Sequence, residues 1–279
     1  MKPYLFIILG ATASLWATAI THIMSKDGMV VCADKRSLVD GTPVDDVAKL
    51  RPLGALAGFT CVGATAHIPD SRFFPPLEPF PPFDCFDEVP AFVAQHQLND
   101  FAASLPALAN FLRDDFTLTI RGMEQLRIPL PPRDANNIHF RVLIFRMAAS
   151  QKPEMGIVDL SYVPTPTGVK ITASHTAVDD AEFQTARLFS FGSANYIQNE
   201  LRSGRKKSFE QFRNLAFVQD FIVNRQPVNE VTKTRAAEVS REFIKFASEH
   251  SKEFTGFNDI SADSDCLVVP YTGQIEPLP

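Results

Sequence analysis

The chain has 279 residues, of which 45% are hydrophobic, and a net charge of −5 at pH 7. A chain of this length and composition can bury one large core or two small ones. The negative charge argues against a nucleic-acid partner, and the one basic run, Arg202 to Lys207, is typical of a solvated loop between helices. No segment after residue 17 has the roughly 20 uninterrupted apolar residues that a stable membrane anchor needs.

The first 17 residues have the layout of a secretory signal peptide. Lys2 is followed by the apolar run from Tyr4 to Leu9 and then by small residues. This run is too short to span a bilayer, which takes roughly 20 apolar residues. Cleavage at one of three places would make Thr18, Ser14 or Ile20 the first residue. We expect residues 1–17 to be a signal peptide and the mature protein to be secreted or periplasmic; the alternative is that they form an unprocessed first strand or helix.

Thr18 gains a chemical role if it becomes the N-terminus. Its hydroxyl can attack a carbonyl while its own α-amine, with an ordinary pKa near ~8, accepts the proton. Only cleavage directly before Thr18 produces this pair in one step. A chain starting at Ser14 would need further trimming, and a chain starting at Ile20 would lack the nucleophile.

The first elements after the leader are predicted to be hairpins. Ile20 to Ala33 indicates two strands around an Asp-Gly turn, and the second strand is too continuously apolar to face solvent. A second hairpin pattern runs from Leu50 to Val62. The Pro- and Phe-rich stretch at about residues 68–90 predicts an extended inserted arm, because proline is incompatible with a helix interior or a central strand.

The remaining two thirds alternate between helices and strands. An apolar stripe predicts a helix from Phe101 to Leu112. The later elements are strands at 138–147, 156–163, 168–172 and 266–269, and helices at 209–224 and 229–249. No linker divides the chain, so residues 18–279 are expected to form one α+β domain with sheets stacked between helical layers.

The chain contains four cysteines and six histidines, which are candidates for disulfides and for metal ligands. The cysteines could form disulfides in an oxidising compartment, but Cys32 and Cys61 lie inside apolar strands and are expected to be buried free thiols. The histidines include no pair with metal-ligand spacing, so we expect no metal site and no cofactor.

Several short patterns occur in a defined order. Residues 28–36 have the sequence GMVVCADKR, which places Asp34 sixteen residues after Thr18, and Lys49 follows. The strand ending at Gly63 is followed by small residues, and Ser193 follows Gly192 later in the chain. This ordered set resembles the proteasome β-type subunits of the N-terminal nucleophile (Ntn) hydrolase superfamily. The resemblance covers most of residues 18–269 and implies a four-layer αββα sandwich of two mainly antiparallel sheets between helical layers.

The resemblance also implies a role for each matched residue. Thr18 would be the nucleophile, Lys49 would favour its alkoxide and keep the α-amine neutral, and Asp34 would hold the lysine. The Gly63 amide would bind the oxyanion, and Ser193 would orient the amine or its water. The pocket for a small or medium apolar acyl group would be lined by Ser37, Val47, Cys61 and Thr65.

Three features depart from the family. The family's Asp-x-x-Ser-Gly-Gly motif before the last strand cannot be recognised in this sequence. Asp259 and Ser261, or Asp263 and Ser264, could replace it, but neither pair is in the proper register. The arm is foreign to the family, and so is a secretory leader. We therefore expect an exported threonine-type hydrolase that cleaves peptide or other amide bonds through an acyl-enzyme, with self-association into a homo-oligomer left open. The alternatives are an inactive scaffold or binding subunit, which uses the arm as its contact surface, and a non-peptidase amidase.

Overall fold

The computed structural model describes residues 18–39, 42–63, 66–67, 83–96, 98, 100–125, 138–166, 168–178, 180–205, 207–255 and 258–279. The expected leader, residues 1–17, and most of the Pro/Phe-rich arm, residues 68–82, lie outside the described residues. Within the described ranges, no helix combines the length and the apolarity needed to cross a membrane.

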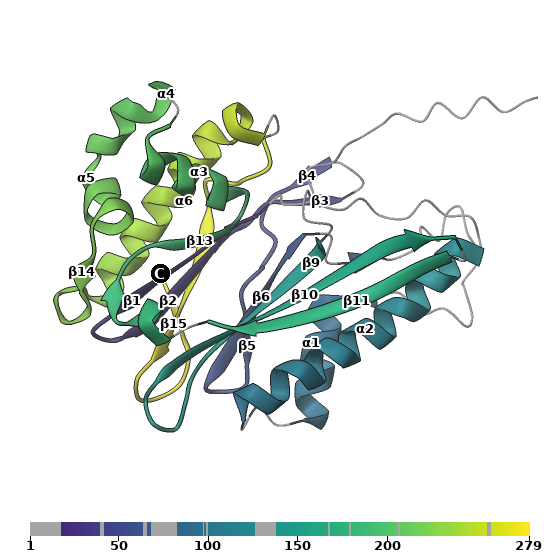
Figure 1. Cartoon of the computed structure of the whole chain (residues 1–279). Coiled ribbons are helices and arrows are strands. Elements are labelled where there is room, and N and C mark those ends of the chain that lie inside the picture. Colours follow the sequence, from purple (N-terminus) through teal and green to yellow (C-terminus); the bar gives the residue numbers. More distant parts are fainter. Residues whose placement is uncertain are drawn as a thin grey trace, which may run out of the picture.

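Five strands form the first sheet, and every neighbouring pair in it is antiparallel (Figure 1). Their order is β13 (Phe189–Gly192), β1 (Ala19–Ser25), β2 (Gly28–Asp34), β15 (Ser264–Pro270) and β16 (Glu276–Leu278). The predicted β1–β2 hairpin is confirmed, and its turn is closed by Ser25 Oγ, which donates to the Gly28 carbonyl at 2.8 Å. Both strands are buried over their whole length.

The second sheet also has five antiparallel strands. Their order is β11 (Gly168–Ala177), β10 (Pro153–Thr165), β9 (Ile138–Met147), β6 (Ala57–Gly63) and β5 (Arg51–Leu53). The predicted hairpin of residues 50–62 corresponds to β5 and β6, and the strand predicted at 138–147 has the bounds of β9.

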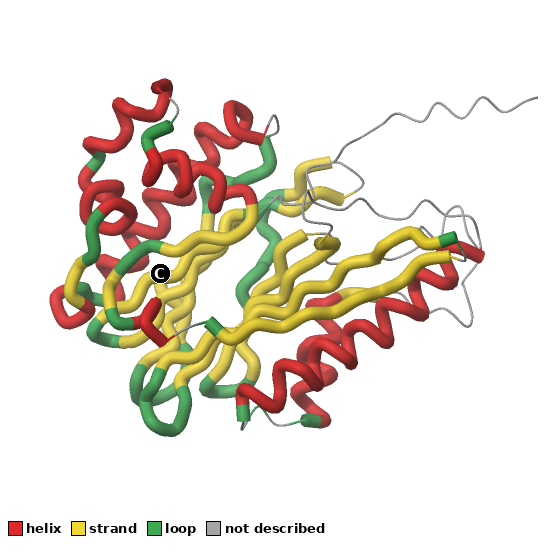
Figure 2. The backbone as a smooth tube through the Cα atoms, in the orientation of Figure 1, coloured by secondary structure: helices red, strands yellow, loops and turns green. Residues whose placement is uncertain are grey.

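Three hydrophobic cores lie one behind another through the molecule. The facing sides of the two sheets share one core, which includes Ile20, Val31, Val62 and Leu143. The outer face of the first sheet packs against α3 (Ser193–Ser203) and α6 (Lys233–Thr255), and the outer face of the second packs against α1 (Cys85–Gln95) and α2 (Phe101–Gln125). Figure 2 shows the helices on the two outer sides with the strands between them. The chain is therefore an α+β protein with two antiparallel sheets.

Three helices differ from their predicted bounds. The helix predicted at 229–249 is α6, which runs from Lys233 to Thr255. Helix α2 runs to Gln125 instead of Leu112, because its buried stripe continues through Phe116, Ile120 and Met123. The helix predicted at 209–224 is divided, because Leu215 takes an extended conformation with ψ 137°. The resulting pieces are α4 (Lys207–Glu210), η2 (Gln211–Asn214), α5 (Ala216–Val218) and the π-helical η3 (Gln219–Val223).

Two helices were not predicted at all. Helix α3 starts after Gly192 with no side-chain cap, so its first turn has no sequence signature. Helix α1 lies across the end of the expected arm and contains Pro90, so the extended arm does not run to that residue. Asp84 is its N-cap and accepts a hydrogen bond from the Phe86 amide at 2.8 Å, a signal that the prolines nearby obscured.

The other elements are short. Three two-stranded ladders join β3 (Ser37–Val39) to β4 (Thr42–Val44), β7 (Ala66–His67) to β8 (Phe83–Asp84), and β12 (Thr185–Ala186) to β14 (Gln226–Pro227). Two 3₁₀ turns, η1 (Asp180–Phe183) and η4 (Val228–Glu230), complete the described elements.

The expectation that Cys32 is a free thiol is wrong, because a disulfide joins it to Cys266. The two cysteines are directly opposite each other on the adjacent strands β2 and β15, with their Cα atoms 4.1 Å apart. Cys61 is a buried free thiol, as predicted. The apolar pattern correctly predicted that Cys32 is buried. Its disulfide partner lies 234 residues later, on a strand that pairs with β2, and so could not be read from the local pattern.

Glu88, in the first turn of α1, makes stability depend on pH. Burial, and then the neighbouring carboxyl of Asp115 on α2, raise its pKa to about 7. The raised pKa contributes stability that is complete below the unfolded value, near ~4.3, and is lost as the pH rises through about 7. We therefore expect Glu88→Gln to raise the melting temperature at pH 8 and to leave it unchanged at pH 4.5. Glu242→Gln, on the exposed face of α6, is the control, and an equal response of both variants would contradict the prediction.

Candidate active site

The β1–β2 hairpin places Asp34 beside Thr18. Its register pairs Ile20 with Ala33, so the last residue of β2 lies next to the first residues of β1. Asp34 Oδ1 accepts a hydrogen bond from the Ala19 amide at 2.6 Å, and both Thr18 (5% exposed) and Asp34 (0%) are buried. The tight hairpin therefore brings Asp34 next to Thr18, although the two lie sixteen positions apart in the sequence.

Lys49 joins these two residues from a separate segment. Its Nζ lies 3.0 Å from Asp34 Oδ1 and 3.2 Å from Thr18 Oγ1, and only 4% of the residue is exposed. Lys49 lies two residues before β5, so the second sheet places it against the first. The structure thus brings together the predicted hydroxyl, lysine and aspartate in one buried chain of hydrogen bonds.

Burial changes the protonation of this chain. It lowers the pKa of Lys49 from the usual 10.5, although the Asp34 carboxylate opposes this effect. It raises the pKa of Asp34 as well, against the opposing effects of Lys49 and of the Ala19 and Ser261 amides. A lysine with a lowered pKa, within hydrogen-bond distance of a hydroxyl, is suited to exchange a proton with it.

Ser193 lies on the other side of Thr18. Its amide donates to the Thr18 carbonyl at 3.1 Å, and its Oγ donates to Asp259 Oδ2 at 2.7 Å. Asp259 is completely buried. Sequence reasoning named Asp259 only as a stand-in out of register, because the loop that carries it lacks the family's Ser-Gly-Gly. The pairing with Ser193, 66 residues away, identifies Asp259 as a site residue.

Arg36 supports the site, although no role was predicted for it from the sequence. Its amide donates to Asp34 Oδ2 at 3.0 Å, and its guanidinium binds Asp45 and the Asn258 side chain and carbonyl. The Ser261 amide donates a further hydrogen bond to Asp34 Oδ2 at 3.2 Å. Arg36 therefore connects the loops on both sides of the site.

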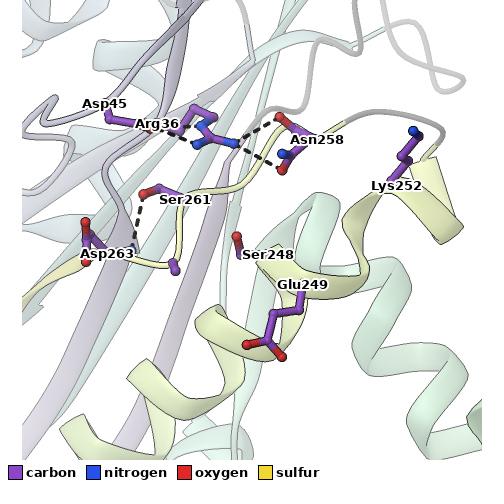
Figure 3. A pocket seen from close by; sticks show the side chains of 9 residues that line it. Arg36, Asp45, Ser248, Glu249, Lys252, Asn258, Ser261 and Asp263 are labelled. Atoms are coloured by element: carbon purple, nitrogen blue, oxygen red, sulfur yellow. Dashed lines mark hydrogen bonds and ion pairs between the residues drawn. The ribbon is translucent and has the colours of Figure 1, made fainter.

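A pocket of about 510 Å³ opens beside these supporting residues (Figure 3). It is lined by Arg36, Asp45, Ser248, Glu249, Lys252, Asn258, Ser261, Ala262 and Asp263. Thr18 is not one of the lining residues. The pocket thus borders the loops that support Asp34 and does not open onto the Thr18 hydroxyl.

The predicted oxyanion residue, Gly63, ends β6 with a φ of +100°. A Cβ at this position would lie 2.6 Å from the His139 carbonyl, so the site requires glycine. Val62, next to it, faces the first sheet: its Cγ1 lies 3.4 Å from the position of a Cβ on Gly192, which adjoins Thr18. The end of β6 therefore approaches the Thr18 segment from the second sheet.

The four residues predicted to line the acyl pocket differ in their burial and position. Cys61 is 1% exposed and packs in the core under α1 and α2, on the opposite face of β6 from Val62. Ser37 and Val47 are half-buried, and the Val47 amide donates to the Lys35 carbonyl at 2.9 Å. Thr65 lies outside the described residues.

Gly192 has to remain glycine for the site to form. Its φ is +72°, and a Cβ there would lie 2.1 Å from the Thr18 carbonyl oxygen. Gly54 has a similar φ of +69° but no atom within 4 Å of a Cβ, so it serves as a matched control. We expect Gly54→Ala to lower the free energy of unfolding by about 1–2 kcal/mol, from the left-handed backbone alone. Gly192→Ala should lower it by about 4 kcal/mol or more in chemical denaturation. If both variants lose the same free energy of unfolding, the backbone around residue 192 has relaxed to avoid the Thr18 carbonyl, and the prediction is wrong.

No protein-family model and no curated protein sequence matches this chain. In the part of the chain that the structure describes, no three side chains of His, Cys, Asp or Glu are placed to hold a metal ion.

Proposed function

We propose that this chain is an exported threonine-type hydrolase of the Ntn class, which cleaves peptide or other amide bonds through an acyl-enzyme. The observation that carries the proposal is the buried contact of Lys49 Nζ with both Thr18 Oγ1, at 3.2 Å, and Asp34 Oδ1, at 3.0 Å. The two facing sheets with helices outside them support the finer assignment to the αββα sandwich of that class.

The reaction begins when cleavage of the Ala17–Thr18 bond frees the α-amine. The amine takes the proton of Thr18 Oγ1, and the oxygen attacks the substrate carbonyl. The Gly63 amide stabilises the oxyanion, a contribution of about 3 kcal/mol at comparable sites. The protonated amine then passes its proton to the leaving nitrogen, and water releases the acyl group from the threonine ester.

The remaining residues have supporting roles. Asp34 holds Lys49 beside the hydroxyl, and the Ser193–Asp259 pair holds the backbone of Thr18 through the Ser193 amide. Ser37, Val47, Cys61 and Thr65 remain the proposed lining of an acyl pocket, although the burial of Cys61 favours a role in its wall. Peptides or other amides are the proposed substrates, and no cofactor takes part in this scheme.

The proposed export is supported by the Cys32–Cys266 disulfide. Disulfides persist in oxidising compartments and are rare in the cytosol. Together with the layout of residues 1–17, the bond favours a secreted or periplasmic protein.

A second candidate function is a non-catalytic scaffold. The observation in its favour is that Thr18 is only 5% exposed in the unprocessed chain, which leaves a substrate little access to the hydroxyl. The two functions differ in the mature N-terminus that they require.

The test is the N-terminal sequence and intact mass of the protein recovered from its native host. A hydrolase requires a chain that starts at Thr18 and that gains the mass of one acyl group when it is incubated with an activated acyl ester. A chain that starts at Met1, Ser14 or Ile20 and gains no such mass would overturn the proposed activity in favour of the scaffold.

A further inference from the structure

Arg187 is the only buried arginine in the described part of the chain, with 7% of the residue exposed. It lies between β12 and β13, and its guanidinium carbon is 5.2 Å from the centroid of the Phe189 ring. This cation–π contact stabilises the charge but does not use the N–H donors of the group. Among the described residues, no carboxylate forms an ion pair with Arg187 and no acceptor takes a hydrogen bond from its side chain. A buried cation without an anion costs free energy, so Arg187 lacks a partner that its burial calls for.

Arg225 is placed next to Arg187 by the short ladder of β12 and β14. The two strands are antiparallel, and Ala186 is paired with Gln226. One further residue along both strands brings Arg187 and Arg225 together at the end of the ladder. Cβ atoms of opposite residues on antiparallel strands lie about 5 Å apart, and like charges there destabilise the pair. Arg225 is exposed, so the two neighbouring positive charges lie at the boundary between the core and the solvent.

Arg202, in the last turn of α3, approaches the same place from the helical layer. The Gln198 side chain donates to the Leu188 carbonyl and accepts from Ser190 Oγ, so α3 runs back along β13. Arg202 is four residues after Gln198, on the same face of the helix and one turn nearer its end. It therefore lies beside the segment that precedes Leu188, which is Arg187. Arg202 is exposed and is the first residue of the basic run noted in the sequence.

These three arginines give the region an excess of positive charge. Burial, and then the charges of Arg202 and Arg225, lower the pKa of Arg187 below its ordinary value, although a guanidinium remains charged near neutral pH. The carboxyl of Glu182 on η1 opposes this effect, but in the described ranges it forms no ion pair with Arg187. Three guanidinium groups and one carboxylate leave about two positive charges without compensation.

We propose that Arg187, Arg202 and Arg225 bind a doubly charged oxyanion, either the free phosphate ion or the phosphate group of a small ligand. The planar fork of a guanidinium matches two oxygens of a phosphate group at once. Arg187 forms the buried base of the site, and the exposed Arg202 and Arg225 meet the anion from the solvent side. A phosphate group with a charge of about −2 balances the excess, whereas a carboxylate balances only half of it.

The site lies away from the proposed catalytic residues. In the ladder of β1 and β13, Gly192 is paired with Ala19, next to Thr18, and Phe189 is at the other end of the strand. Arg187 lies beyond Phe189, so the length of β13 separates it from Thr18. Anion binding is therefore independent of the proposed hydrolase activity and would occur in a scaffold as well.

The test is isothermal titration calorimetry of the full chain with inorganic phosphate near pH 7, with sodium chloride added to keep the ionic strength constant. The expected result is one saturable site with a dissociation constant of about 1 mM or lower, and binding of acetate at least about tenfold weaker. Glycerol 3-phosphate distinguishes the two sources: binding as tight as that of phosphate assigns the site to a phosphorylated ligand, and loss of binding assigns it to the free ion. No saturable binding up to about 20 mM phosphate, or equal affinity for acetate, would overturn the proposal.

Three variants test the assignment of the residues. Arg187→Met and Arg225→Met should each weaken phosphate binding at least about tenfold, because each removes charge-assisted hydrogen bonds. Arg187→Met should also melt no lower than the parent in phosphate-free buffer, since it removes a buried cation that has no anion there. Arg235→Met is the control, because Arg235 is an exposed arginine of α6 that already pairs with Glu238 at 3.4 Å, and it should leave binding unchanged. Unchanged binding in Arg225→Met, which is at the surface and should not disturb folding, would overturn the site. So would an equal loss in Arg235→Met.

Discussion

Thr18→Ala is expected to reduce amide hydrolysis by at least about 10⁴-fold, because removal of a catalytic nucleophile has effects of this size in other hydrolases. The domain should remain folded, since the hydroxyl contact with Lys49 Nζ that the substitution removes is worth about 1 kcal/mol. Turnover and the unfolding transition are measured on the same protein preparation, from which the leader has been removed so that residue 18 is the first.

Thr18→Ser is the matched control for this variant. It keeps a primary hydroxyl and the α-amine, so it should retain part of the activity that alanine loses. Retained turnover in Thr18→Ala would exclude Thr18 as the nucleophile. A loss of folding in both variants would instead assign the residue to the structural core of β1.

Lys49→Met is expected to lower the free energy of unfolding by about 3–5 kcal/mol and to abolish activity. Asp34 is completely buried, and removal of Lys49, its ion-pair partner at 3.0 Å, leaves a buried carboxylate with much less charge compensation. Methionine keeps the length of the side chain, so the loss reports the charge and not the packing. Chemical denaturation near pH 7 measures the effect.

Two further variants test the cause. Lys35→Met removes a lysine that pairs with Asp46 and Asp265 at the surface, and it should leave the denaturation midpoint almost unchanged. Adding Asp34→Asn to Lys49→Met removes the uncompensated charge and should restore part of the lost stability without restoring activity. If Lys49→Met is as stable as Lys35→Met, the buried pair does not have the proposed energetic importance.

The pairing of Ser193 with Asp259 bears on the choice between enzyme and scaffold. The sequence alone left this part of the candidate site open, because the residues around Asp259 match the closing motif of the resembled family only out of register. The structure places the buried carboxylate of Asp259 2.7 Å from Ser193 Oγ, so these two residues are paired although the motif is not matched in register. This observation favours the enzyme, whereas the 5% exposure of Thr18 favours a precursor or a scaffold.

Local patterns in the sequence determined the β1–β2 hairpin and with it the proximity of Asp34 to Thr18. A two-residue turn sets the register, and the register sets which residues of the two strands are neighbours. The same holds for strand β9 and for the apolar stripe that starts α2, because period-two and helical spacing are properties of neighbouring residues.

Only the tertiary structure decided the contacts between distant segments. The Ser193–Asp259 bond, the Lys49–Thr18 contact and the Cys32–Cys266 disulfide join residues 66, 31 and 234 positions apart. The disulfide forms where β2 pairs with β15 in one sheet, and the other two contacts form where separate segments meet at the site. Neither long-range strand pairing nor packing leaves a periodic trace in the sequence. The end of α2 and the break at Leu215 were missed for a related reason: helix length and interruption depend on which side chains the neighbouring layer buries, and local propensity gives way to that burial.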